Sequence, residues 1–337
     1  MTVTSSAHGG STTGNSLAQA FRWHKPLMTV AAAMVVLAVV GAVGIVADGR
    51  VVTGLPIWAK PTKFALSILL YSVTWAWLIA QLSRARRTAW WMGTVSAVFL
   101  GVEMLIIVGQ VLRGTTSHFN QATTFDTMLW RAMGGSIALV WVATLIVCVT
   151  LFLNPGPDRA RNLAVRAGAI LAVVGMALGF LMVIPTSDQI AEGETISGAH
   201  TVGLTDGGPG LPLLGWSTVG GDLRIPHFVG MHALQLIPLA AIALELLARS
   251  WPLLRRRRVA VRLVAVAVAG YAAVLALLTW QALRGQSIVH PDGLTLLTMA
   301  GILVGMGVGA IAALRTAAEH REPPLPEDDR SADLLAS

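Results

Sequence analysis

Long apolar stretches separated by short polar segments dominate the pattern along this chain. Eight of them reach the roughly 20 residues that a helix needs to cross a bilayer. In hydrocarbon each segment must satisfy its own backbone hydrogen bonds, so an open chain crosses as a helix. The sequence therefore predicts an all-α, polytopic transmembrane bundle of about eight helices. The expected spans are residues 26–47, 63–82, 89–111, 128–153, 164–185, 227–249, 259–282 and 294–315.

The composition agrees with a hydrocarbon environment. Hydrophobic residues fill 55% of the 337 positions and charged residues only 12%, against roughly 25% charged residues in ordinary soluble domains. Mean hydropathy is +0.69. No gap between the apolar stretches could hold a soluble domain, so we expect one membrane domain over 26–315. Residues 1–25 and 316–337 are polar and are expected to be disordered tails.

The basic residues predict an orientation. Most of the 24 Lys and Arg residues fall on one side of the membrane, with Arg255–Arg258 as the strongest cluster. Cytoplasmic loops carry such an excess. We therefore expect both termini in the cytoplasm and a multi-pass protein of the bacterial inner (plasma) membrane. The net charge of +7 does not indicate nucleic-acid binding, because the arginines lie between apolar stretches. The lipid bilayer is the expected partner.

Polar residues without a topological role gather at the outer ends of the predicted helices. Glu103 lies deepest, eight residues before Val111 or ~12 Å along the third helix. A carboxylate there is costly in lipid and should face protein or water. We expect an outward-opening polar pocket between the third and sixth helices, beside the long outer loop 186–226. Glycines four apart also mark expected helix contacts, at Gly175 and Gly179 and at Gly301, Gly305 and Gly309.

The first functional hypothesis is a redox protein that binds haem or copper. Its metal ligands would be His118, His227 and His232, because imidazole suits both groups. The spacing is unfavourable, since residues five apart differ by about 140° around a regular helix. His227 and His232 could share an ion if the helix begins after His227. The simpler interpretation is that each histidine makes one hydrogen bond between helices.

The second hypothesis is an interfacial enzyme that acts on a lipid-like or isoprenoid substrate. Such an enzyme needs a proton donor and acceptor together with groups that hold an anion. Lys60 and Lys63 bracket Pro61 and are therefore well positioned, whereas other cations at this end could simply pair with Asp126 or Asp222. The candidate catalytic residues are Glu103, His118, Asp126 and His232, and the candidate anion-binding residues are Lys60, Lys63, Arg113, Asn120 and Gln235.

The third hypothesis is a proton-coupled transporter. Intramembrane ionisable residues and broken helices are typical of transport pathways. Glu103 and His232 could carry a proton, and Pro238 offers a break in the sixth helix. The inner half contains few matching polar residues apart from Glu245, which disfavours a continuous pathway. The sequence leaves the substrate, the reaction and the oligomeric state open.

Overall fold

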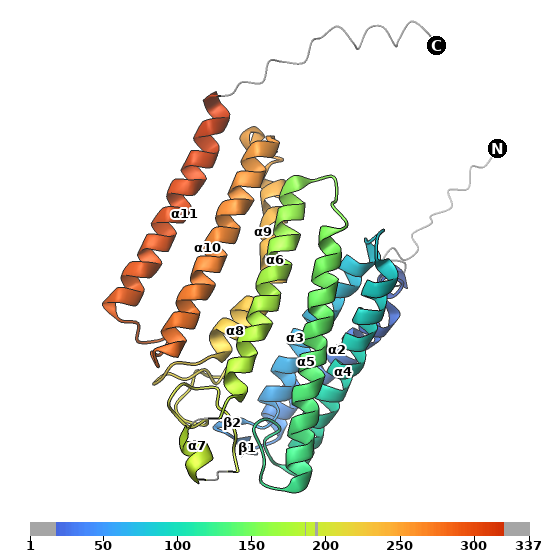
Figure 1. The fold of residues 1–337 in the computed structure, drawn as a ribbon, viewed down its shortest axis with the longest axis vertical. Coiled ribbons are helices and arrows are strands. Elements are labelled where there is room, and N and C mark those ends of the chain that lie inside the picture. Colours follow the sequence, from blue (N-terminus) through green and yellow to red (C-terminus); the bar gives the residue numbers. More distant parts are fainter. Residues whose placement is uncertain (1–17, 186, 193–194, 320–337) are drawn as a thin grey trace, which may run out of the picture.

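The computed structural model describes residues 18–185, 187–192 and 195–319. Its long helices lie side by side as a bundle (Figure 1). Short elements occupy the connections: β1 (Val51–Val52), β2 (Leu55–Pro56), α7 (Ser187–Glu192) and η2 (Pro252–Arg255). The long elements are α2 (Lys25–Ala47), α3 (Ala59–Ala80), α4 (Arg86–Arg113), α5 (Thr124–Phe152), α6 (Arg159–Leu178) with η1 (Gly179–Val183), α8 (Arg224–Met231), α9 (Ala233–Leu247), α10 (Arg257–Leu283) and α11 (Gly293–Glu319).

Seven helices in the described ranges are long and apolar enough to cross a membrane. The pair α8 and α9, bent by 47° at its break, brings the number to eight if it crosses as one broken span. The prediction of an all-α polytopic bundle of about eight helices is confirmed. Large apolar side chains such as Leu105 and Leu297 face outward, 75% and 72% exposed. Lipid is the solvent that tolerates such a surface.

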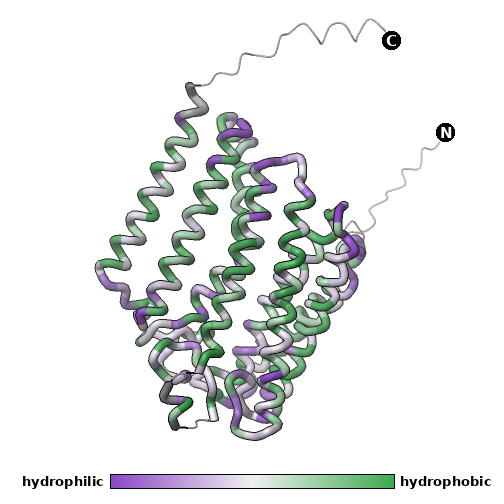
Figure 2. The backbone as a smooth tube through the Cα atoms, viewed as in Figure 1, coloured by the Kyte–Doolittle hydropathy of each residue, from purple (hydrophilic) through white to green (hydrophobic). Residues whose placement is uncertain are grey.

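The bundle has two polar ends separated by an apolar middle, as Figure 2 shows. We call one the loop end, where segments 48–58, 114–123, 184–223 and 284–292 meet. The other is the arginine-rich end, which includes the α5–α6 connection and the starts of α6 and α10. Both described ends of the chain lie at the arginine-rich end (Figure 1), which fits an even number of crossings.

The helices form two packed groups. Helices α2 to α5 pack on one another, and α6 packs with α8, α9 and α10. The contact between α5 and α6 joins the groups, and α11 packs chiefly on α10. The expected helix contacts at the glycines are present at some positions and absent at others. Gly175 lies so close to Gly230 that a Cβ atom on either would meet backbone at 2.4 Å or less, whereas Gly301 and Gly305 face open space.

The sixth predicted span is not one continuous helix. Pro238 lies inside α9, and the break falls earlier, at His232. The contact of Gly230 with Gly175 holds α8 against α6. The ring of His232 instead lies 3.5 Å from the Ser67 hydroxyl on α3. The bend therefore falls where the chain passes from the α8 contact with α6 to the His232 contact with α3, and not at the proline.

The tail predictions fall largely outside the described residues, which exclude 1–17 and 320–337. Within the described part, His24 caps α2. Its Nδ1 accepts a hydrogen bond from the Leu27 amide at 3.2 Å. Its Nε2 donates to the Trp90 carbonyl at 2.8 Å and so ties the start of α2 to α4.

The long loop is fastened over the loop end of the bundle. The Ser197 amide donates to the Phe119 carbonyl and the Gln121 amide to the Thr195 carbonyl, at 2.9 and 2.7 Å. On its other side Lys63 donates from Nζ to the Leu214 carbonyl at 2.7 Å. The loop therefore forms a cover whose side chains join those of α3 and α4.

Candidate acid–base site

Glu103 is the central residue of the candidate site. It lies on α4 and is only 1% exposed. Neither carboxylate oxygen has a hydrogen-bond partner among the described residues. A buried polar group without a partner is costly, and each such group in a folded protein calls for an explanation. Its Oε1 lies 3.7 Å from Nε2 of His118, too far for a hydrogen bond but within ion-pair range.

His118 comes from the 114–123 connection and lies in an aromatic surround. Its ring contacts Phe64, Phe119 and Trp130, with centroids 5.5, 6.1 and 5.6 Å away. The Ser117 hydroxyl lies 3.1 Å from Nδ1. Burial lowers the pKa of His118 well below its ordinary value, and the charge of Lys60 lowers it further. The imidazole is therefore neutral near pH 7.

The long loop supplies a histidine–aspartate pair. His200 donates from Nδ1 to Oδ2 of Asp206 at 2.5 Å, and its backbone amide donates to Oδ1 at 3.0 Å. Burial alone would raise the pKa of Asp206, but the hydrogen bonds that it accepts from the ring and the backbone amide of His200 lower it to about 2. Burial also lowers the pKa of His200, against the influence of Asp206. His200 is thus a neutral imidazole held in one tautomer by an ionised carboxylate.

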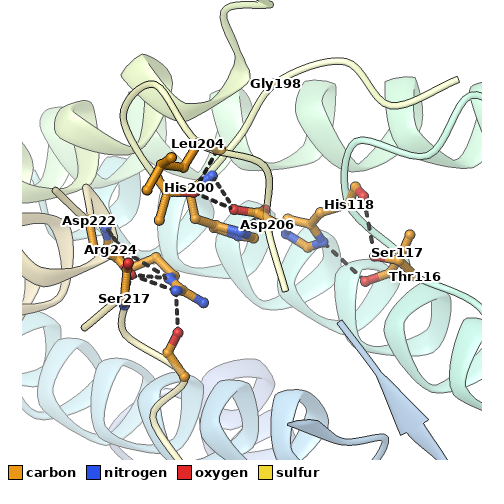
Figure 3. A network of polar contacts seen from close by, with 12 residues as sticks. Thr116, Ser117, His118, Gly198, His200, Leu204, Asp206, Ser217, Asp222 and Arg224 are labelled. Carbon is orange, nitrogen blue, oxygen red and sulfur yellow. Dashed lines mark hydrogen bonds and ion pairs between the residues drawn. The ribbon is translucent and has the colours of Figure 1, made fainter. Parts of the chain in front are cut away.

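Phe119 brings the two histidines together. Its ring lies 4.9 Å from that of His200 and is also next to His118. Phe119 has a left-handed backbone, φ 63°. Gly198 has φ +106°, and a Cβ atom there would lie 2.8 Å from the Phe119 ring. Only glycine fits this conformation and this approach. Figure 3 shows His118 and His200 close together, with Asp206 beside the His200 ring.

Three cations surround these groups, and two of them already have partners. Lys63 holds the Leu214 carbonyl. Arg224 pairs with Asp222, Nη2 to Oδ2 at 2.5 Å, and also donates to the Gly215 carbonyl (Figure 3). Lys60 has no hydrogen-bond partner within the described ranges, and its Nζ lies 6.0 Å from the Phe64 ring centroid. Its charge interacts favourably with Glu103 and Asp206 and unfavourably with Lys63 and Arg224.

Asp126, Arg113 and Asn120 take part in local hydrogen-bond networks. Asp126 accepts hydrogen bonds from Arg113, Gln110 and Thr123 at 2.5, 2.9 and 2.6 Å. Asn120 donates to Thr115 and to the Thr116 carbonyl, and accepts from the Ala122 amide. These bonds shape the connection that carries His118. They leave Asp126 and Asn120 no direct role that the geometry supports.

His227 and His232 each make contacts that do not involve His118. His227 donates from Nδ1 to the Gly175 carbonyl at 2.7 Å. His232 packs on Phe228, with ring centroids 4.4 Å apart. Gln235 donates to the Thr74 hydroxyl, and its own carbonyl oxygen is buried with no hydrogen-bond partner among the described residues. In the described part of the chain, no three His, Cys, Asp or Glu residues are grouped to hold a metal ion. The haem or copper hypothesis therefore gains no support.

The sequence did not single out the His200–Asp206 pair. A signal was present, since a histidine and an aspartate lie six residues apart in a turn-rich segment of the longest loop. Helix and strand periodicity cannot indicate which loop residues meet, so the pairing emerges only from the folded loop.

Comparison with known proteins adds no assignment: no family model, curated protein or solved structure matches this chain. The fold defines a polytopic helical membrane protein, and its function must be inferred from the site.

Proposed function

We propose that this protein is a membrane enzyme performing general acid–base chemistry on a lipid with an anionic headgroup. The observation that carries the proposal is the His200–Asp206 pair placed beside His118 and the unpartnered Glu103. A carboxylate that fixes one imidazole nitrogen leaves the other free to accept a proton, the arrangement used by many general bases.

Each residue has a proposed role. Nε2 of His200 removes a proton from a substrate hydroxyl or from water, and Asp206 fixes the tautomer that makes this possible. Glu103 and His118 form the second proton-exchanging pair. Lys60 is the proposed anion ligand, because it is the cation of the cluster whose hydrogen-bonding capacity is unused in the described structure. A positioned ammonium can stabilise a phosphate or carboxylate.

A lipid-like substrate suits the position of the site. The loop end lies where the apolar band of the bundle gives way to polar residues (Figure 2), which is the depth of a lipid headgroup. The distribution of arginines favours the outer face of a bacterial plasma membrane for this end. The acyl or isoprenoid chain would remain in the bilayer while only the headgroup reached the site.

The test compares lipids of membranes that contain wild-type protein, His200→Gln or His290→Gln. His290 is the matched control, an exposed histidine at the same end whose ring has one hydrogen-bond contact in the described structure, with the Thr218 carbonyl. Relative to membranes that lack the protein, the amount of an anionic lipid measured by mass spectrometry should change with wild type and with His290→Gln. It should not change with His200→Gln. Purified wild type in vesicles of that lipid should reproduce the change. Equal lipid profiles for wild type and His200→Gln would refute the proposal.

A proton-coupled carrier is a second candidate, favoured by the bent span. Broken helices with polar groups at the break are typical of transporters. The break at His232 contacts Ser67, and Gln235 contacts Thr74 further along α3. Proteoliposomes containing a pH-sensitive dye distinguish the candidates. A carrier should move protons with its solute and lose this in His232→Gln, whereas an enzyme should show no such flux.

A further inference from the structure

A groove at the arginine-rich end lies at the opposite side of the bundle from the acid–base site. It encloses about 540 Å³ between the end of α5, the α5–α6 connection, the start of α6 and Arg257 of α10. This volume is in the range of roughly 300–1,000 Å³ typical of small-molecule sites. The groove therefore has room for a ligand of substantial size.

The charge of the groove is positive. Its walls include Arg159, Arg166 and Arg257, and none of the described residues that line it is acidic. Arg159 and Arg257 are exposed and make no hydrogen bond or ion pair in the described structure. Phe152 holds Arg166 in place: Arg166 donates from Nη2 to the Phe152 carbonyl at 3.2 Å, and its Cζ lies 5.0 Å from the centre of the Phe152 ring. Arginine binds phosphate through paired N–H donors, so this arrangement favours a phosphate group.

The groove is also built on a fixed connection. Asn162 accepts from the Gly156 amide at 2.8 Å and donates to the Gly156 carbonyl at 2.6 Å. Asn154 accepts from the backbone amides of Ser83 and Arg84 and donates to the Arg84 carbonyl. These bonds hold the α5–α6 connection in one shape, so the arginines are positioned before a ligand arrives.

Apolar side chains form the rest of the wall. Phe152 and Ile170 are each 45% exposed, and Leu163 also lines the groove. Inorganic phosphate would contact only the arginines and leave these groups unused. A phospholipid fits both the arginines and the apolar wall, because its headgroup is anionic and its chains are apolar.

We propose that this groove binds an anionic phospholipid from the leaflet at the arginine-rich end. The headgroup phosphate contacts Arg159, Arg166 and Arg257, and an acyl chain follows Phe152 and Ile170. Because α6 and α10 both contribute, the bound lipid links their starts. This inference is independent of the acid–base function at the other end.

Native mass spectrometry of the full chain in detergent tests the proposal by titration with phosphatidylglycerol and phosphatidylcholine. Wild type should bind phosphatidylglycerol at least tenfold more tightly. The double variant Arg159→Gln/Arg257→Gln should lose that preference, whereas Arg86→Gln/Arg87→Gln, two exposed arginines outside the groove, should keep it. Equal loss in both double variants would show diffuse surface charge and overturn the site.

A charge-neutral variant guards against misfolding of the arginine variant. Ala167 lines the groove, so Ala167→Phe fills it without changing any charge. It should reduce phosphatidylglycerol binding at least tenfold while the helical circular dichroism stays unchanged. Unchanged binding in a folded Ala167→Phe protein would overturn the proposal. So would inorganic phosphate competing as strongly as the lipid, because the ligand would then be a free anion.

Discussion

Glu103 and Asp126 are both buried carboxylates at the loop end, but their surroundings differ. Asp126 is satisfied by Arg113, Gln110 and Thr123. Glu103 has no hydrogen-bond partner in the described structure and faces His118 and Lys60 at longer range. A satisfied carboxylate stabilises the fold, whereas an unsatisfied one persists where function requires it. The comparison separates a structural network from a candidate catalytic one.

The largest expected effect concerns Glu103 and is confined to activity. Glu103→Gln removes the charge and keeps the shape, so it should lower turnover of the lipid substrate by about 10²-fold or more, the usual contribution of an acid–base residue. Its thermal midpoint should stay unchanged or rise, because a costly buried carboxylate is gone. Turnover by mass spectrometry and a thermal melt check the two parts. A clear loss of stability with retained turnover would reverse the assignment.

Asp126→Asn should show the opposite pattern. The amide cannot accept equally from Arg113, Gln110 and Thr123, and Arg113 loses its ion pair. We expect a loss of about 2 kcal/mol in stability, limited because Arg113 is partly exposed. Turnover per folded molecule should change little. Unfolding in increasing denaturant, followed by tryptophan fluorescence, measures the first quantity. An unchanged midpoint would show that the network is dispensable.

A smaller effect concerns pH. Burial lowers the pKa of His118 and His200 below their ordinary 6.5. Below that pH the unfolded chain binds more protons than the folded one, so stability is complete above about pH 6.5 and falls with acid. The wild-type melting temperature should drop between pH 7.5 and 5.5, because each of the two histidines lowers the free energy of unfolding by up to about 1 kcal/mol over this interval.

The double variant His118→Gln/His200→Gln should reduce the slope of this pH profile. Asp206 cannot contribute in the same window, because its pKa is about 2. His290→Gln is again the control and should keep the wild-type slope. A slope as steep in the double variant as in wild type would place the acid-sensitive groups elsewhere in the chain.

The sequence predicted the bundle well because hydrocarbon imposes a simple rule: each span must be an apolar helix of roughly 20 residues. The rule acts on length and polarity, so it located the sixth span but not its bend at His232, which depends on contacts with α6 and α3. The sequence also could not show which residues on different helices contact one another. The sequence could not show that Asp126 accepts hydrogen bonds from Arg113 and Gln110, or that Gly301, expected at a helix contact, faces open space.

The two groups of helices contribute unequal shares of the acid–base site, and this bears on biogenesis. Lys60, Glu103 and His118 belong to the first four spans, whereas His200 and Asp206 follow the fifth. During synthesis the earlier spans enter the membrane carrying an acid and an amine whose later neighbours do not yet exist. The nascent protein must shelter these groups until the long loop emerges, so a chain truncated after α5 should be recognised by quality-control proteases.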